Sequence, residues 1–83
     1  MEKLLKIKCF GVARDITGAS EVQLEWEESP ISVGQLKSNL EARFVQLRKL
    51  KSYFIAVNQE FAEDSDSISF TDELAIIPPV SGG

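Results

Sequence analysis

The sequence of 83 residues contains no histidine and a single cysteine, Cys9. A zinc site built from the usual histidine and cysteine ligands needs more such residues, so we expect no bound metal. The absence of histidine also excludes a Ser-His-Asp triad and general acid–base catalysis by an imidazole. One cysteine cannot form an internal disulfide bond, which fits a reducing compartment. The composition therefore argues against an enzyme that carries its own catalytic set.

Long apolar runs and an excess of basic residues are also missing. No apolar stretch approaches the roughly 18 residues that a membrane-spanning helix needs. The first ten residues, "MEKLLKIKCF", lack the apolar run and the cleavage site of a signal peptide. The 9 Lys and Arg residues are outnumbered by 13 Asp and Glu residues, and the resulting net charge of −4 disfavours nucleic acid as a partner. We therefore expect one small cytoplasmic domain that binds neither membrane nor nucleic acid.

Alternation of apolar and polar residues predicts two strands in the first third of the chain, at residues 3–10 and 21–26. The residues that share the inward face are Leu5, Ile7 and Cys9 in the first strand and Val22, Leu24 and Trp26 in the second. Residues 11–18, "GVARDITG", are expected to form a loop or a single helical turn closed by glycine. The two strands then form a hairpin with a long connection.

A helix is predicted to begin at Ser32. Ser32 and Gln35 have the spacing of a capping box, in which each side chain bonds to the backbone amide of the other residue. Apolar residues then recur at helical spacing and form one stripe, which consists of Val33, Leu36, Leu40 and Phe44. Residues 45–51 leave two interpretations open, a continued core or a second short turn.

The last third of the chain holds three predicted strands. Residues 53–57, "YFIAV", and 74–78, "LAIIP", are apolar, and Phe61 is expected to start a short return strand after a turn at 58–60. Residues 63–67, "EDSDS", are expected to form an acidic surface loop, because they lack the glycine and the distal glutamate of a calcium loop.

The predicted order of strand, strand, helix, strand, short strand and strand is that of an α+β fold of the β-grasp (ubiquitin-like) type. In this fold a mixed sheet carries one main helix packed on one face, and the first and last strands lie parallel at the centre of the sheet. The predicted domain covers residues 1–77.

Strand parity predicts an apolar patch on the sheet face that the helix does not cover. Phe10 and Ile77, with Leu4 and Ala75 as further candidates, point away from the helix. Single exposed apolar residues are normal, but a contiguous patch usually marks a docking surface. We therefore favour docking over a chance grouping.

The final residues predict an extended tail, which consists of Pro78, Pro79, Val80, Ser81, Gly82 and Gly83. The two prolines cannot donate to a sheet and favour a stiff, extended stem. The two glycines have no Cβ and can therefore pass through a narrow channel. Such a tail suits delivery of the terminal carboxylate into another protein's active site, and the alternatives are a frayed end or a cloning scar.

Four stretches of the sequence resemble one known family. They are "CFGVARDITG", "SVGQLKSNLEARF", "AVNQEF" and "DELAIIPPVSGG". In this order they are similar to the small subunit of molybdopterin synthase, a ubiquitin-like sulfur carrier, and the resemblance covers nearly the whole chain. The final stretch is its most specific element.

The resemblance implies a cycle of sulfur transfer. A ubiquitin-activating-like enzyme would use ATP to adenylate the carboxylate of Gly83, and sulfide from a sulfurtransferase would displace AMP to leave a thiocarboxylate. The large subunit, in a heterotetramer of two small and two large subunits, would pass this sulfur to cyclic pyranopterin monophosphate. The chain would then be a non-catalytic subunit with no stably bound cofactor. The family's apolar contact positions fall on Phe10 and Ile77.

Three other functions stay open at this point. The same sulfur chemistry could serve the thiamine thiazole, a tungsten cofactor or a thiolated tRNA. Alternatively, Gly83 could form an isopeptide bond with a lysine of a target protein, or the chain could be a passive interaction module with an inert tail. Cys9 is expected to be a core thiol rather than a persulfide carrier. Arg14 is either a partner contact or a solvated loop residue.

Overall fold

Helices lie mostly in the first half of the chain and strands occur throughout in the computed structural model, which describes residues 4–26, 31–50 and 53–78. In chain order the elements are β1 (Leu4–Cys9), α1 (Gly11–Thr17), β2 (Glu21–Glu25), β3 (Ile31–Ser32), α2 (Val33–Arg43), the 3-10 helix η1 (Val45–Lys49), β4 (Phe54–Val57), β5 (Glu60–Ala62), β6 (Ser67–Ile68) and β7 (Leu74–Ile77). All the strands that alternation and apolar runs predict are present. The main helix also begins where its capping box predicts.

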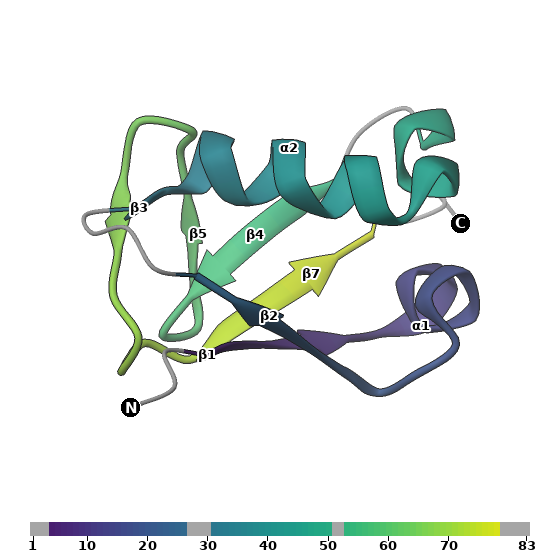
Figure 1. The fold of residues 1–83 in the computed structure, drawn as a ribbon, viewed down its shortest axis with the longest axis horizontal. Coiled ribbons are helices and arrows are strands. Elements are labelled where there is room, and N and C mark those ends of the chain that lie inside the picture. Colours follow the sequence, from purple (N-terminus) through teal and green to yellow (C-terminus); the bar gives the residue numbers. More distant parts are fainter. Residues whose placement is uncertain (1–3, 27–30, 51–52, 79–83) are drawn as a thin grey trace.

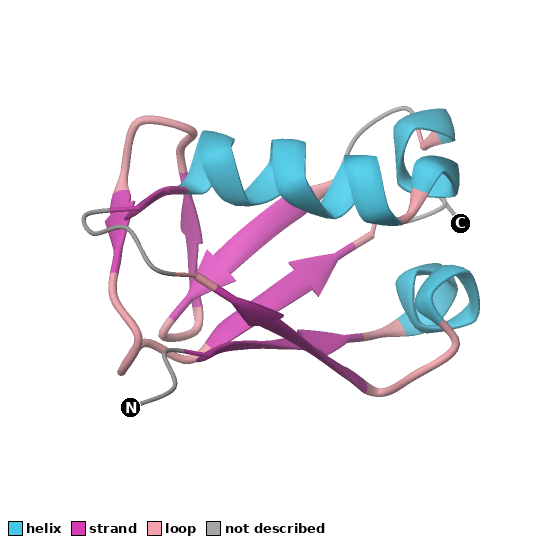
Figure 2. Ribbon diagram, in the orientation of Figure 1, coloured by secondary structure: helices cyan, strands magenta, loops and turns pink. Residues whose placement is uncertain are grey.

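Five of the strands form one mixed sheet in the order β2-β1-β7-β4-β5. β1 and β7 are parallel neighbours at its centre, and the other pairings are antiparallel. Figure 1 shows α2 lying across one face of this sheet, and Figure 2 separates the helical layer from the strand layer by colour. The predicted α+β fold of the β-grasp type is thereby confirmed.

The core lies between α2 and the sheet. Its buried side chains come from the predicted inward faces of the strands and from the predicted helical stripe, and they include Leu5, Ile7, Cys9, Val22, Leu24, Val33, Leu36, Leu40, Ile55, Leu74 and Ile76. Burial of each large aliphatic side chain contributes roughly 1.5–3 kcal/mol to stability. Trp26 and Phe44 are only partly buried and pack against this core.

Residues 11–17 form a helix of seven residues, α1, so the expected loop or single turn is wrong. Ala13 is fully buried and Ile16 packs against the core, which gives this short helix an inward face. Gly18 takes a left-handed conformation with φ of +75°, and its N–H donates to the carbonyl oxygen of Arg14 at 2.8 Å. The helix therefore ends at the glycine that the sequence indicates.

A second, two-stranded sheet has no counterpart among the predicted elements. β3 and β6 pair antiparallel, with Ile31 opposite Ile68 and both side chains buried. Ser67, which the sequence pattern places in the acidic loop at 63–67, belongs to β6. This small sheet leads the chain directly into α2.

Val45–Lys49 form the 3-10 helix η1, so these residues make the second short turn and also contribute to the core, while Lys51 lies outside the described residues. Leu47 is buried and Leu50 packs against the core from the end of this turn. Among the described residues, no helix is long and apolar enough to cross a membrane.

Candidate docking face

The outer face of the sheet, which is the face opposite α2, carries the predicted patch. β1 and β7 run parallel with Cys9 opposite Ile76, so the next residues along each strand, Phe10 and Ile77, also lie beside each other. Parity turns both side chains outward, and Phe10 is 50% exposed. The predicted position of these two residues is confirmed, while their role in partner binding stays a prediction.

A hollow adjoins these two side chains, and we call it the outer-face hollow. It is lined by Lys8, Phe10, Ala56, Gln59, Phe61, Glu73, Ala75 and Ile77. Ala56 of β4 pairs with Ala75 of β7, so two small side chains form its floor. Phe61 pairs with Ala56 from the other side and stands beside that floor. The hollow thus combines a low floor and apolar walls with polar side chains at its border, which is the composition of many binding sites.

Two aromatic residues of this face are not among the predicted site residues. Phe54 and Phe61 stack with their ring centroids 5.1 Å apart, and they are 45% and 69% exposed. Stacked aromatic pairs of this kind contribute about 0.5–1.5 kcal/mol beyond their buried area. Phe54 could have been predicted from the alternation of side chains in "YFIAV", because an inward Ile55 places Phe54 on the outer face.

Leu4 and Ala75, the two further candidates, separate in the structure. Ala75 lines the outer-face hollow. Leu4 lines a different hollow together with Lys6 and Thr71, at the beginning of β1. The inclusion of Leu4 in one patch with Phe10 is therefore wrong, because the length of β1 separates the two residues.

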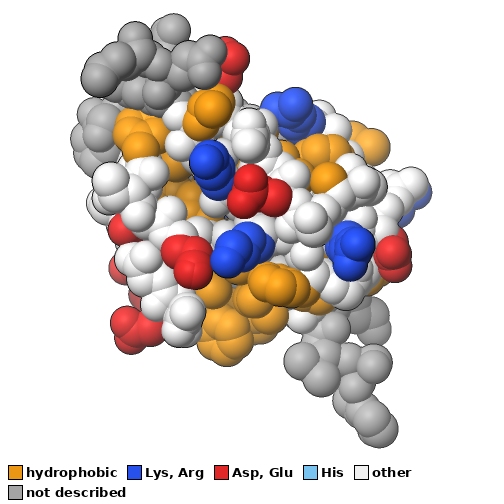
Figure 3. Space-filling model, turned by 90° about the horizontal axis from the view of Figure 1, so that it is seen from below, with side chains coloured by type: hydrophobic (Ala, Val, Ile, Leu, Met, Phe, Trp, Pro, Cys, Tyr) orange, Lys and Arg blue, Asp and Glu red, His pale blue; other side chains and the backbone are white. Residues whose placement is uncertain are grey.

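Charged residues of β1 and β2 lie beside the apolar part of the outer face. Lys6 and Lys8 of β1 stand opposite Gln23 and Glu21 of β2. Lys8 also lies 3.7 Å from Glu73, at the rim of the outer-face hollow. Figure 3 views the molecule from this side and shows hydrophobic side chains in several groups, one of them along the lower edge, beside basic and acidic residues. The face thus offers an apolar contact area with a charged border, as protein interfaces do.

The predicted tail begins at the end of β7, beside the end of the parallel strand β1 where Phe10 lies. Pro78 follows β7 directly, and its Cγ is 3.4 Å from the position that a Cβ on Gly11 would take. The remaining tail residues fall outside the described residues, and the predictions for them stay predictions. They are Pro79, Val80, Ser81, Gly82 and Gly83.

Polar contacts fix the turn that carries one wall of the hollow. Asn58 and Gln59, the two residues of the β4–β5 turn, both have left-handed backbones, with φ of 53° and 73°. The side chain of Asn58 donates to Asp72 at 3.0 Å and accepts from the N–H of Glu73 at 2.9 Å. The Ser69 N–H, followed by the Asn58 amide, holds the pKa of Asp72 below its ordinary value of 3.8. This turn is thereby tied to the residue that precedes β7.

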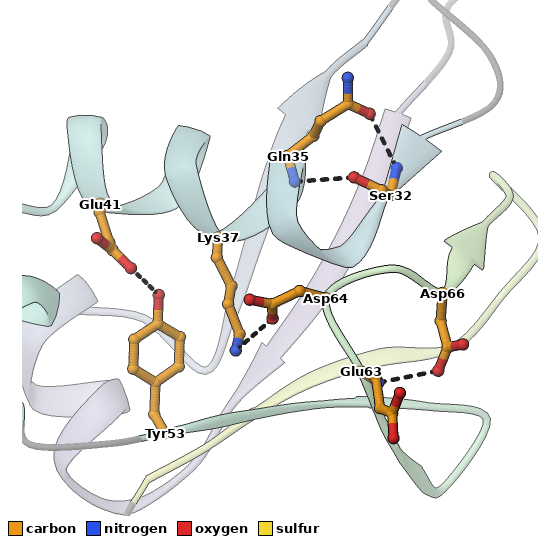
Figure 4. Close-up of polar contacts among 8 residues, drawn as sticks. All are labelled: Ser32, Gln35, Lys37, Glu41, Tyr53, Glu63, Asp64 and Asp66. Atoms are coloured by element: carbon orange, nitrogen blue, oxygen red, sulfur yellow. Dashed lines mark hydrogen bonds and ion pairs between the residues drawn. The ribbon is translucent and has the colours of Figure 1, made fainter.

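A second polar network, drawn in Figure 4, joins α2 to Tyr53, which directly precedes β4, and to the acidic loop. The phenol of Tyr53 donates to the carboxylate of Glu41, and burial, followed by this hydrogen bond, raises the pKa of Tyr53 well above its ordinary range. The amino group of Lys37 lies 5.5 Å from the Tyr53 ring centroid and 2.8 Å from Asp64. These contacts support the strand that carries Phe54 and lie away from the outer face.

The capping box of α2, also visible in Figure 4, is present as predicted. The N–H of Gln35 donates to the Ser32 hydroxyl at 3.1 Å, and the N–H of Ser32 donates to the Gln35 side-chain oxygen at 2.9 Å. The two bonds satisfy backbone donors that the start of a helix leaves without partners.

Cys9 and Arg14 are the other residues with predicted roles. Cys9 is 2% exposed, which confirms it as a core thiol. Arg14 is exposed and lies on α1 rather than in a loop. Within residues 4–26, 31–50 and 53–78, no group of three His, Cys, Asp or Glu side chains could hold a metal ion. The described residues thus offer a candidate docking face and the point where the chain leaves β7.

Comparison with known proteins relates this chain to a family. The model described as the ThiS family matches residues 7–83. The molybdopterin synthase sulfur carrier subunit of Arabidopsis thaliana is 35% identical over 80 residues, which cover 95% of this chain and 82% of that protein. The resemblance of the four sequence stretches is confirmed by this relative.

Two solved structures share the fold. SAMP1 from Haloferax volcanii has a TM-score of 0.79 at 25% identity, with coverage of 96% of this chain and 99% of that one. A chain in the complex of subunits 1 and 2 of the molybdopterin-converting factor from Helicobacter pylori 26695 has a TM-score of 0.63 at 18% identity, covering 96% and 99%. Since the family model matches nearly the whole sequence, the chain belongs to the ThiS family.

Proposed function

We propose that this chain is the sulfur carrier subunit of a molybdopterin synthase and that it carries the sulfur on Gly83. The observation that carries the proposal is the parallel pairing of β1 with β7. This pairing brings Phe10 and Ile77 together at the edge of the sheet where the chain leaves for its tail. The name of the relative from Arabidopsis thaliana supports the same function.

Loading of the carrier needs activation, because a carboxylate is a poor electrophile. An adenylating enzyme of the ubiquitin-activating type attaches AMP from ATP to the Gly83 carboxylate and releases pyrophosphate. Sulfide from a sulfur donor then attacks the acyl carbon and AMP leaves, so that one oxygen of the carboxylate is replaced by sulfur. ATP acts here as a substrate of the activating enzyme, and no stably bound cofactor is needed on the carrier.

Delivery of the sulfur needs a partner that supplies the catalytic groups. The large subunit of the synthase docks on the outer-face hollow, with Phe10 and Ile77 at the centre of the contact. Two small and two large subunits form the heterotetramer. The pterin precursor takes the sulfur there, water supplies the oxygen that restores the carboxylate, and two transfers build one dithiolene. The carrier is thus not an enzyme by itself.

The tail has a division of labour in this proposal. Residues 1–77 form the folded body, and residues 78–83 form the arm. Pro78 and Pro79 aim the arm, because a proline ring fixes φ and favours an extended chain. Val80 and Ser81 then span the distance to the active site. The two glycines pass the narrowest part of the channel, because they have no Cβ.

Intact mass spectrometry tests the loading step. The full chain is incubated with the activating enzyme, ATP and a sulfide source, and its mass is compared with that of a variant that lacks Gly83. We expect the wild-type mass to rise by the difference between one sulfur and one oxygen, and the truncated variant to stay unchanged. A wild-type mass that stays unchanged with an enzyme that loads another carrier would contradict the proposal.

A further inference from the structure

The passage from β1 to α1 takes place at a single residue. Phe10 is still extended, with φ of −127° and ψ of 153°, and Gly11 is the first residue of the helix. Gly11 has a φ of +55°, a conformation that side chains of L residues rarely adopt. The N–H of Ala13 donates back to the carbonyl oxygen of Phe10 at 3.0 Å and closes the turn. The start of α1 is therefore folded tightly against the end of β1.

This turn meets the end of the last strand. Since β1 and β7 are parallel, the chain leaves both strands at the same edge of the sheet. A Cβ on Gly11 would lie 3.4 Å from Pro78 Cγ, so a side chain at position 11 would reach van der Waals contact with the proline ring. Gly18, the other described glycine with a positive φ, would place its Cβ in open space, with nothing within 4 Å. Both glycines therefore have a positive φ, but only Gly11 lies beside Pro78.

We infer that Gly11 is a positioning residue for sulfur delivery: its side-chain-free turn seats Pro78 and thereby sets the direction in which the chain leaves β7. The inference rests on the proposed function. The proline ring fixes its own φ near about −65°, and its position beside Gly11 restricts the direction of the chain at this point. Without a fixed exit the carboxylate of Gly83 would meet the partner's active site in many orientations.

The seat that Gly11 provides for Pro78 also lies directly beside the residues of the docking contact. Phe10, which precedes Gly11, and Ile77, which precedes Pro78, both line the outer-face hollow. A partner that grips these two side chains therefore holds the two residues next to the seat. The seat itself adds to the orientation of the tail rather than to the docking contact. Its loss should slow transfer and leave affinity intact.

Asparagine variants test the effect of an added side chain with little added backbone strain, because asparagine tolerates positive φ better than most other non-glycine residues. Gly11→Asn adds a side chain next to Pro78, and Gly18→Asn adds the same side chain in open space. Both variants are loaded as thiocarboxylates. The dissociation constant for the large subunit and the kcat of sulfur transfer at saturating large subunit are then measured. We expect Gly11→Asn to lower kcat by roughly tenfold or more without changing affinity, since small misplacements of reacting groups can cost about 100-fold. Gly18→Asn should change neither quantity.

Two kinetic results overturn the inference. One is an equal kcat for both variants and the wild type. The other is a loss of affinity in Gly11→Asn that accounts for the whole loss of transfer, which would assign Gly11 to docking.

A nuclear Overhauser experiment on the free chain decides the question without any activity. It should show contacts between the Gly11 Hα and the Pro78 ring protons in the wild type and in Gly18→Asn. Absence of these contacts in the wild type overturns the inference. A wild-type chain that keeps the contacts but transfers no sulfur would instead contradict the proposed function.

Discussion

Among single residues, Tyr53 makes a polar contact between α2 and the segment that leads into β4. Its phenol is buried beneath α2 and donates to Glu41, while Lys37 lies over its ring. A buried hydroxyl with a charged acceptor stabilises the fold only while the phenol keeps its proton. Tyr53 is also the single tyrosine of the chain, so its titration can be followed without interference from another phenol.

Replacement of Tyr53 by phenylalanine should therefore change stability in a pH-dependent way. At neutral pH we expect Tyr53→Phe to lose about 1 kcal/mol, because the hydrogen bond to Glu41 is absent. Burial raises the pKa of Tyr53 in the folded state, so above the ordinary value of 10.0 the unfolded wild-type chain ionises first. Wild-type stability should then fall as the pH rises above 10, and the advantage over Tyr53→Phe should shrink.

Urea unfolding of the two proteins at pH 8 and pH 11 measures this difference. The two proteins differ only at position 53, so the comparison removes the contribution of the residues that they share. A stability difference that is the same at both pH values would contradict the assigned environment of Tyr53.

Among the elements, those with local signals are the ones that the sequence predicts. α2 has a capping box and a four-residue stripe, and β1 and β2 alternate over at least five residues. α1, β3 and β6 are short and depend on contacts with distant residues. Ile31 gains its place as a strand residue only by pairing with Ile68, 37 positions later in the numbering. A window of neighbouring residues does not contain that information.

The residues of the candidate site also differ in whether local sequence or distant pairing determines their position. Phe10 and Ile77 follow from parity alone, because each belongs to a strand whose inward face is clear from its neighbours. The second wall of the hollow depends on the register of β5, where Phe61 stands opposite Ala56. A three-residue strand has too few residues to reveal its register in the sequence.

The β4–β5 turn offers a prediction at the scale of an element. Gln59 has a positive φ, which costs a non-glycine residue about 1–2 kcal/mol. Glycine avoids this strain but loses more conformational entropy on folding, which costs about 0.5–1 kcal/mol. We therefore expect Gln59→Gly to stabilise the fold by roughly 0.5–1 kcal/mol. Asn58→Gly relieves the same kind of backbone strain but removes the contacts to Asp72 and Glu73, so it should destabilise the fold. Thermal unfolding of both variants checks the pair, and a loss of stability in Gln59→Gly speaks against the positive φ at this position.

At the scale of the whole molecule, the fold places one apolar face and one chain departure point at the same edge. The partner contact should be sensitive to charge there and insensitive to charge elsewhere. We expect Ile77→Asp to weaken binding of the large subunit roughly tenfold or more, because an interface centre tolerates an unpaired carboxylate poorly.

Val45→Asp is the matched control for this binding measurement. Val45 is 59% exposed and lies on η1, so the variant adds the same charge at an exposed apolar position outside the outer-face hollow. Isothermal titration of the large subunit with each variant should give wild-type affinity for Val45→Asp only. Equal affinities for all three proteins would refute the docking role of the outer face.

Discharge of the loaded carrier tests the central claim most directly. The thiocarboxylated chain is mixed with the large subunit and the pterin precursor, and its intact mass is followed through a single turnover. The account predicts that the mass returns to that of the carboxylate, in step with the appearance of sulfur on the pterin, only when both components are present. A thiocarboxylate that persists in the complete mixture would contradict the account.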